Sequence, residues 1–475
     1  MKNLKRPVRE RPVHFLWFKR STLHMASAYV MVLLPWLVQT PLAKAQSLPD
    51  LYIRALARDP AVAGAEAQLH AAEQRHVQAR ASFGPTAALV GNYNETRYRE
   101  APKYEQRKFQ GKQLNLQITQ PLLRSALFPA LDSAEAQLYQ AQAALDQARA
   151  DSAQRLVEAC FEVLKARDAL DLARAQRVST AEQLMLAQRS FKIGTAPIID
   201  VREAEAKADS VAAQVSAAEF ELDLRLQIVA ELTGQTASTL LTRGLDGKHL
   251  PPLEAGSASL WLATAQDNSA QLQQARQALL AAEAEVRKAW HGHAPTADLT
   301  YTYGRSSDTG TLTTAFPRGG NSSAVGVNLN IPLFASGATH SKVNEARALR
   351  DKAQSDVDAA RRTISLGVRQ NTSATLSAIG QAHGLEAAVR SQELAFRANR
   401  RGYEVGMKVN AEVLDSQSRL FEARRDLSRA RYDAWAGYIK LKALAGRLDE
   451  SDISTLDALL VSVAQADMRL PRRQQ

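Results

Sequence analysis

The sequence predicts a mostly α-helical membrane protein of mixed α/β class, with four β-strands per chain and an internal duplication. Three observations support this prediction. One stretch of helical periodicity is far longer than a typical globular helix. Short segments with a period of two have one apolar and one polar face. The same order of segments then recurs about 210 to 212 residues later along the chain.

The long stretch runs from Pro129 to Lys192 and contains no glycine and no further proline. As a helix it would span roughly 95 Å. Its apolar residues follow a heptad, with small residues three positions further on: Leu131, Leu138 and Leu145, then Ala134, Ala141 and Ala148. Because alanine lets helix backbones approach closely, the pattern favours a wall of side-by-side helices over a coiled-coil rod.

The first 45 residues are predicted to be a secretory signal peptide. Lys19 and Arg20 precede an apolar run from Ala26 to Val38, and Ala43-Lys44-Ala45 supplies a cleavage site. This leader holds eight Lys/Arg and one acidic residue, so only about +4 of the formal charge of +11 belongs to the mature chain. Nucleic-acid binding therefore loses its main compositional support.

The sequence indicates neither an enzyme nor a bound cofactor. Cys160 is the only cysteine, which excludes an intramolecular disulfide and is typical of a small core residue. His291 and His293 flank Gly292, a pattern more often interfacial than metal-binding. We find no phosphate-binding glycine loop and no nucleophile elbow, so the chain shows no motif for nucleotide hydrolysis or for acyl transfer.

Residues 46–257 form the first predicted repeat, which begins with one helix from about Asp50 to Ala81. It continues with strands at about 86–95 and 112–121, a long helix at about 129–193 and a helix at about 197–233. The charged segment from Glu95 to Gly111 is expected to be a loop between the strands. Gly194 and Pro197 mark the turn of the helical hairpin.

Residues 258–448 form the second predicted repeat. It has an initial helix, strands at about 297–304 and 323–332, and helices at about 338–402 and 410–446. The segment from Gly304 to Ser323 is expected to be a loop, and Gly406 corresponds to Gly194. The tail, 449–475, carries no motif and is expected either to wrap around the helices or to be partly disordered.

The strands predict a barrel made by several chains. Leu114, Leu116 and Ile118 face one way, while Gln113, Asn115 and Gln117 face the other. Four strands cannot close a barrel in lipid, so two or three copies are needed, and the polar face favours three copies around a water-filled lumen. A soluble sandwich would not explain the long helices at each end of the strand pairs.

The junctions and turns resemble those of the outer-membrane factor family, particularly its TolC-like members. The resemblance covers about Leu48 to Leu448 and is carried by the segments Gln120-Pro121-Leu122-Leu123, Ile331-Pro332-Leu333-Phe334, Phe191 to Asp200 and Tyr403 to Asp415. It implies a homotrimer in the outer membrane of a Gram-negative bacterium, with a twelve-stranded β-barrel continued by a long periplasmic α-helical barrel. Pro85, Pro121, Pro295 and Pro332 would mark the passage between the two barrels.

The resemblance also implies roles for residues near the turns. Asp200 would be bonded by Tyr403 and Lys408, which would hold the entrance closed, although Lys408 lacks the guanidinium fork of the family's arginine. Without the family, these would be ordinary exposed turn residues. Glu412 and Asp415 share a helix face and would form an acidic constriction that favours cations. Glutamate replaces the family's aspartate at position 412, and a divalent cation bridging the ring would plug the channel.

The resulting functional hypothesis is a passive exit duct for type I secretion or tripartite efflux. Its expected partners are outer-membrane lipid, a periplasmic adaptor (membrane-fusion protein) and an inner-membrane transporter, either ABC-type or proton-driven. The adaptor would dock at the turns that contain Gly194, Pro197 and Gly406. The alternatives are a periplasmic coiled-coil adaptor or tether without a pore and, more remotely, a peripheral binding protein.

Overall fold

The computed structural model describes residues 47–100, 105–235, 240, 242–245, 249–254, 256–310 and 316–462. The chain divides into two units, Met1–Lys44 and Ala45–Gln475. The predicted signal peptide, residues 1–45, lies outside the described residues. The description below therefore concerns the second unit alone.

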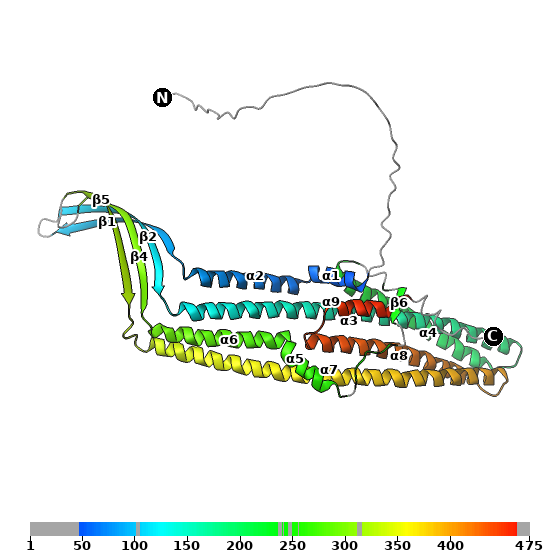
Figure 1. Ribbon diagram of the computed structural model, residues 1–475. Coiled ribbons are helices and arrows are strands. Elements are labelled where there is room, and N and C mark those ends of the chain that lie inside the picture. The colour runs from blue at the N-terminus through cyan, green and yellow to red at the C-terminus, as the bar shows by residue number, and fades with distance from the viewer. Residues whose placement is uncertain are drawn as a thin grey trace, which may run out of the picture. The chain divides into compact units, whose positions relative to one another are not determined.

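Two helices of almost equal length dominate this unit (Figure 1). Helix α3, Leu127–Lys192, has 66 residues, and α7, Ala338–Glu404, has 67. At 1.5 Å per residue each spans about 100 Å. Each ends in a tight turn and is followed by an antiparallel helix packed along it, α4 (Ile198–Thr233) after α3 and α8 (Asn410–Leu444) after α7.

The expected single helix from Asp50 to Ala81 is in fact two helices, which corrects that prediction. Helix α1, Leu48–Arg58, and helix α2, Pro60–Ala81, meet at Asp59. Pro60 has no backbone N–H to donate and forces the residue before it out of the helical region. Asp59 is accordingly extended, and its carboxylate accepts a hydrogen bond from the backbone N–H of Ala61 at 2.9 Å.

The second repeat shows the same division without a proline. Helix α5, Ala258–Asn268, and helix α6, Ala270–Trp290, are separated by Ser269, whose backbone is extended. Ser269 is buried, and its carbonyl accepts the backbone N–H of Gln273 at 3.0 Å. The break at Ser269 is therefore produced by tertiary packing, because no residue in the local sequence predicts it.

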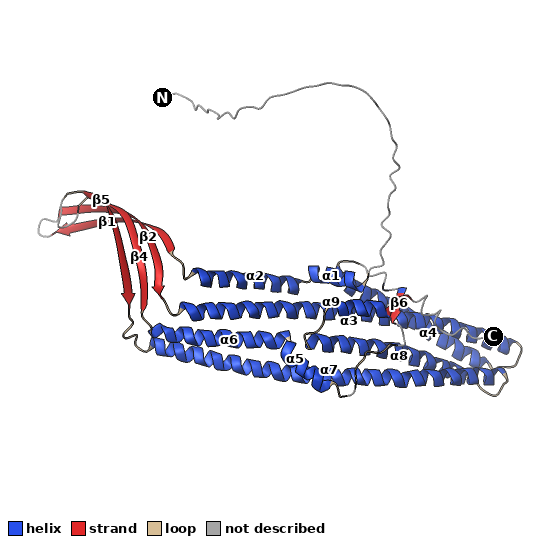
Figure 2. Ribbon diagram, in the orientation of Figure 1, coloured by secondary structure: helices blue, strands red, loops and turns tan. Residues whose placement is uncertain are grey.

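The four long strands form one antiparallel sheet in the order β1-β2-β4-β5 (Figure 2). The strands are β1 (Thr86–Glu100), β2 (Glu105–Leu123), β4 (Thr296–Asp308) and β5 (Arg318–Asn330). Pairing places Leu89 opposite Leu116, and Leu116 opposite Tyr303, so the apolar residues share one face. Leu89 is 69% exposed, which shows that the chain's own helices leave this face uncovered.

The strands extend into both segments that were expected to be loops. Arg97 lies opposite Lys108 in the β1–β2 pair, well inside the expected Glu95–Gly111 loop. Glu95 binds both cations, at 2.9 Å and 2.8 Å, and so offsets their mutual repulsion across the strands. Strands β4 and β5 likewise run on to Asp308 and from Arg318. Charged residues that were interpreted as turn-forming instead form cross-strand pairs.

The tail is folded as far as residue 462. Helix α9, Glu450–Leu459, leads into β6 (Leu460–Ser462), which pairs with β3 (Arg243–Leu245). Ile453, Leu456 and Leu460 are buried against the α3 segment that contains Phe161. Of the two expectations for the tail, packing around the helices is therefore the one seen for 449–462, while 463–475 lie outside the described residues.

No helix in the described part of the chain is both long and apolar enough to cross a membrane.

Candidate functional site

The two hairpin turns have the same backbone geometry. Gly194 and Gly406 both adopt a left-handed conformation, with φ of 77°. In each turn the glycine N–H donates to a carbonyl three residues earlier, Phe191 in one and Tyr403 in the other, at 3.0 Å. A side chain at this φ would be strained, which explains why both turns carry glycine. Pro197 caps the start of α4 in an extended conformation.

Asp200 and Asn410 connect the two hairpins beside these turns. Asn410 is fully buried at the start of α8, and its Nδ2 donates to the backbone carbonyl of Asp200 at 3.3 Å. Partial burial raises the pKa of the Asp200 carboxyl above its usual value of 3.8. The pKa of Tyr403 is also raised, first by burial and then by the negative charge of Asp200. Asp200, Tyr403 and Asn410 therefore form one cluster.

Lys408 is not joined to Asp200 in the single chain. Its Nζ binds Glu412 Oε2 at 2.5 Å, one helical turn away. The lysine stem passes so close to Gly402 that a Cβ there would lie 2.7 Å from Lys408 Cγ. In the same way, Asp415 Oδ2 binds Arg419 Nη2 at 2.8 Å. Both carboxylates of the expected constriction thus have a basic partner beside them.

The contact between the two hairpins is incompletely hydrogen-bonded. Among the described residues, four buried polar atoms near the turns have no hydrogen-bond partner: Gln183 Oε1, Tyr403 Oη, Asn410 Oδ1 and Gln417 Oε1. Ser190 lies near Tyr403, but it makes no hydrogen bond of normal geometry with the Tyr403 hydroxyl. Each unsatisfied buried group costs about 1–3 kcal/mol. The hairpins are consequently held together less firmly than their burial suggests.

Large apolar side chains surround the turns and are exposed. They are Ile193, Ile199, Val405 and Met407, between 58% and 79% exposed. Apolar residues clustered at the end of a hairpin are typical of a surface that meets another protein.

The four prolines expected at the barrel junctions lie at or near strand ends. Pro85 and Pro295 directly precede β1 and β4, and Pro332 follows β5 by two residues. Pro121 lies inside β2, where the pairing register shifts between Pro121 and Leu123. At the same junction the guanidinium of Arg124 donates two hydrogen bonds to Asp298, at 2.9 and 2.7 Å.

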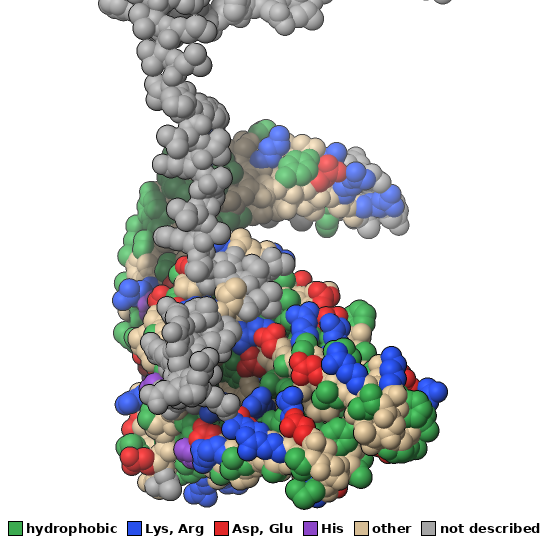
Figure 3. Space-filling model, turned by 90° about the vertical axis from the view of Figure 1, so that its right-hand side faces the viewer, with side chains coloured by type: hydrophobic (Ala, Val, Ile, Leu, Met, Phe, Trp, Pro, Cys, Tyr) green, Lys and Arg blue, Asp and Glu red, His purple; other side chains and the backbone are tan. Residues whose placement is uncertain are grey.

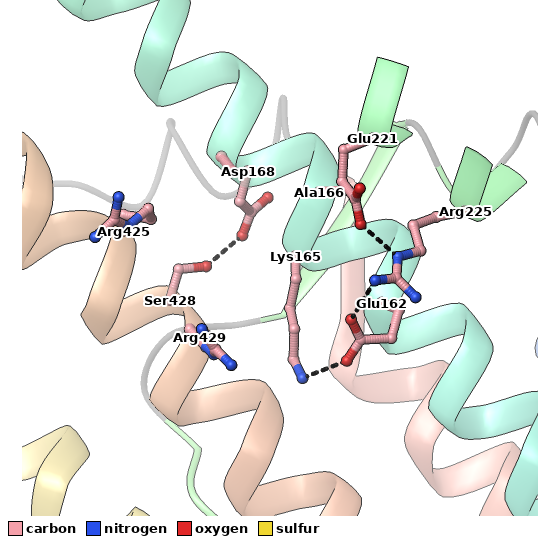
Figure 4. Close-up of a pocket in the computed structure, with 10 residues that line it drawn as sticks. Glu162, Lys165, Ala166, Asp168, Glu221, Arg225, Arg425, Ser428 and Arg429 are labelled. Carbon is pink, nitrogen blue, oxygen red and sulfur yellow. Dashed lines mark hydrogen bonds and ion pairs between the residues drawn. The ribbon is translucent and has the colours of Figure 1, made fainter. Parts of the chain in front are cut away.

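A charged groove of about 270 Å³ lies between α3, α4 and α8 (Figure 4). Glu162 accepts a hydrogen bond from Lys165 at 2.8 Å and lies 4.0 Å from Arg225, which also binds Glu221 at 2.7 Å. On the opposite wall, Ser428 donates to Asp168 at 2.6 Å. The groove's carboxylates accept hydrogen bonds or ion pairs from neighbouring side chains, and these contacts connect α3 with α4 and α8.

The residues considered for other chemistry lie apart from these turns. His291 and His293 form a single turn, η2 (His291–His293), between α6 and β4. The described residues contain no group of three or more His, Cys, Asp or Glu that could hold a metal ion. Cys160 is buried in the core, which raises the pKa of its thiol to about 12.

Sequence reasoning missed Asn410 and Arg419. Asparagine at the first position of a helix looks like an ordinary capping residue, and Arg419 belongs to a heptad helix with many other arginines. The one signal in the sequence that could have identified Arg419 is its position four residues after Asp415, since this spacing is typical of an ion pair on a helix.

Comparison with known proteins agrees with this geometry. The family profile described as "Outer membrane efflux protein" matches residues 51–235 and 261–447, most of both repeats. This chain belongs to that family. Outer membrane protein TolC of Vibrio cholerae is 30% identical over 417 residues, covering 87% of this chain and 94% of TolC. The alkaline protease secretion protein AprF of Pseudomonas aeruginosa is 28% identical over 429 residues, covering 88% of each chain.

Solved structures show the same fold. Outer membrane protein VceC of Vibrio cholerae superimposes with a TM-score of 0.71 at 20% identity, covering 85% of this chain and 97% of that chain. The chain is therefore an outer-membrane exit duct for type I secretion or efflux, in a Gram-negative outer membrane and extending into the periplasm. Its family is one of channel and transport proteins, not of enzymes. A tether without a pore is not favoured.

Proposed function

We propose that three copies of this chain close a twelve-stranded barrel in the outer membrane, continued by a helical barrel that is gated at the hairpin turns. The observation that carries this proposal is the open sheet. Strands β1 and β5 are each paired on one side only among the described residues. An unpaired strand edge in lipid costs several kcal/mol per backbone group, so the edges must meet those of other copies.

The strand faces support three copies. Eight strands from two copies would leave an interior just filled by side chains, whereas twelve leave an aqueous lumen. Asn115 lies opposite Gly304, and Gln117 opposite Thr302, so one face of the sheet is polar along its length. Such a face needs water, while the apolar face that contains Leu89 and Leu116 suits lipid.

The row of helices also has two free edges that could pack against those of neighbouring copies. Helix α2 packs on α3, and α3 packs in turn on α6 and, nearer the turns, on α4 and α8. Helices α2 and α7 are the outermost of the row beside the sheet (Figure 1). In a closed ring, α7 of one copy would pack on α2 of the next. Leu349 and Leu366 on α7 are more than half exposed and would be covered there.

The gate consists of the cluster of Asp200, Tyr403 and Asn410, with Lys408 at its edge. Asn410 bridges the hairpins, and the Tyr403 hydroxyl is buried beside the Asp200 carboxylate. Because several of its polar atoms lack partners, this contact is weak enough to separate when another protein binds. Glu412 and Asp415 would then line the entrance.

Partners supply the energy and the opening force. A periplasmic adaptor would bind the exposed apolar residues at the turns that contain Gly194, Pro197 and Gly406, and it would connect the duct to an inner-membrane transporter. AprF, as its name states, is a protease secretion protein. Residues 1–45 would be removed as a leader, leaving 46–257 and 258–448 as two structural repeats.

The decisive experiment is single-channel conductance of the detergent-purified protein in a planar bilayer, with native mass spectrometry to count the copies. The wild type should give a small conductance that rises several-fold in Asn410→Ala, which removes the hydrogen bond to the backbone carbonyl of Asp200. Arg202→Gln is the matched control, since Arg202 lies on α4 near the turn but pairs only with Glu205 on its own helix.

Each outcome separates parts of the proposal. A protein that forms no pore would refute the duct. A dimer with a pore would refute the trimer, and a large wild-type conductance that Asn410→Ala leaves unchanged would refute the gate.

A further inference from the structure

A stripe of alternating charge begins at Lys408, in the turn before α8, and continues along the exposed face of the first turns of α8. Lys408 binds Glu412 at 2.5 Å, and Asp415 binds Arg419 at 2.8 Å. All four side chains are between 43% and 63% exposed. The stripe contains two carboxylates and two cations, so its formal charge is zero.

Helix geometry keeps Glu412, Asp415 and Arg419 together on α8. Lys408 lies in the turn before the helix and is held beside them by its ion pair with Glu412 and by the packing of its stem against Gly402. Residues three and four apart lie on the same helix face, about 5–6 Å from each other. The intervening residues Val413, Leu414 and Ser416 are buried against other helices, which fixes the orientation of α8. Wherever Glu412 and Asp415 face in the assembled duct, Arg419 faces as well, and the ion pair with Glu412 brings Lys408 to the same side.

We propose that Lys408 and Arg419 neutralise the carboxylate ring at the entrance of this duct, so that it passes anionic and cationic substrates alike and does not retain divalent cations. This inference rests on the proposed function, because it needs the ring that three copies would form. There, six carboxylates would be matched by six cations within one helical turn.

The magnitudes favour neutralisation even where the individual ion pairs are weak. Exposed pairs of this kind contribute about 0–1 kcal/mol to folding stability and open readily. When a helical pair opens, however, the Cβ atoms of its two residues stay about 5–6 Å apart, so the tethered charges remain on the order of one Debye length from each other, which is about 8–10 Å at ordinary salt. An ion passing through the ring therefore experiences the sum of both charges.

The wider surface has the same character. Figure 3, which looks toward the face where the hairpin turns lie, shows basic and acidic side chains interspersed rather than gathered by sign. Along α8 the pattern continues with Arg429, which lies 3.7 Å from Asp433. A mixed surface produces no strong field of one sign that would select ions.

The test is the ion selectivity of the reconstituted full-length protein, measured as the reversal potential across a KCl gradient. The wild type should discriminate weakly between K⁺ and Cl⁻. Arg419→Gln, and more so Arg419→Gln combined with Lys408→Gln, should raise the K⁺/Cl⁻ permeability ratio at least about threefold, the effect of roughly one kT of uncompensated potential. Added Mg²⁺ should block the double variant and leave the wild type open.

Two control variants separate ring charge from general charge and from folding. Lys352→Gln removes a cation of similar exposure from a 2.7 Å pair with Asp356 on α7, away from the turns, and should change nothing. The exchange Asp415→Arg with Arg419→Asp keeps the pair and its net charge, and should keep wild-type selectivity.

The outcomes distinguish this inference from the proposed function. Absence of any conductance would refute the duct itself. A conducting wild type that is strongly cation-selective and blocked by Mg²⁺, or an Arg419→Gln variant with unchanged selectivity, would overturn neutralisation and leave the duct in place.

Discussion

Replacement of Arg167 by methionine should release the small β3–β6 sheet from the middle of α3. Arg167 is 94% buried, an unusual position for a guanidinium. It donates to the backbone carbonyl of Arg243 in β3 and, at 3.5 Å, to that of Leu240, and it pairs with Asp168. Methionine retains the unbranched apolar stem of the side chain but removes every donor.

The expected loss follows from these contacts. A hydrogen bond from a charged donor contributes about 1.5–3 kcal/mol, and removal of one partner of a buried ion pair costs about 3–5 kcal/mol. Asp168 would keep its hydrogen bonds from Ser428 at 2.6 Å and from Tyr432 at 3.2 Å. The expected loss of stability therefore lies toward the lower end of the roughly 3–5 kcal/mol range. A loss of about 3 kcal/mol corresponds to a factor of more than about 100 in the opening equilibrium.

Hydrogen exchange with mass spectrometry measures this opening directly. The amides of β3 and β6 should exchange about 100-fold faster in Arg167→Met than in the wild type, because among the described strands each of the two pairs with the other alone. Exchange in the half of α3 nearest the turns should stay unchanged, which would show that the variant remains folded.

The matched control is Arg174→Met, two turns further along α3. Arg174 is 53% exposed and pairs with Glu219 at 2.8 Å, so its loss should cost less than about 1 kcal/mol. The claim that Arg167 holds the sheet would be refuted if the β3 and β6 amides of Arg167→Met exchanged at a rate within about threefold of the wild type. It would also be refuted if that rate equalled the rate in Arg174→Met.

Three further predictions concern other buried groups. Thr180→Val combined with Gln417→Leu should raise the denaturant midpoint, since it removes a 3.3 Å hydrogen bond together with a buried unsatisfied oxygen. Thr180→Val alone should lower the free energy of unfolding by about 1–3 kcal/mol, and with it the midpoint, because Gln417 then loses its partner. Burial raises the pKa of Asp200, so the closed state that buries this carboxyl becomes more stable as pH falls from neutral through the raised pKa toward the usual 3.8. Channel openings should therefore become rarer on acidification. A similar pH dependence in Asp200→Asn would contradict this origin. Cys160, with a thiol pKa of about 12, should resist maleimide at pH 7 in the native protein and react after denaturation; native labelling at the rate of a free thiol would contradict the core packing.

The sequence by itself determined the features that follow from local periodicity. The proline-free heptad of α3 requires a long helix, because 3.6 residues per turn repeatedly return Leu131, Leu138 and Leu145 to one face. Alternation in the strands determined which residues share a face, since successive side chains point to opposite sides of a strand. Glycine at 194 and 406 indicated left-handed turns, which depend on the backbone of one residue.

Tertiary structure alone decided the partners of individual side chains. Lys408 could pair with the carboxylate of Asp200 on α4 or with that of Glu412 on α8. The folded turn packs the lysine stem against Gly402, and this packing directs the ammonium group to Glu412. The buried bridge from Asn410 to Asp200 joins residues 210 positions apart. Strands β3 and β6 have three residues each, too few to show a period, and they exist because α9 brings β6 beside β3. Such contacts depend on which surfaces meet in space, and no local pattern encodes that.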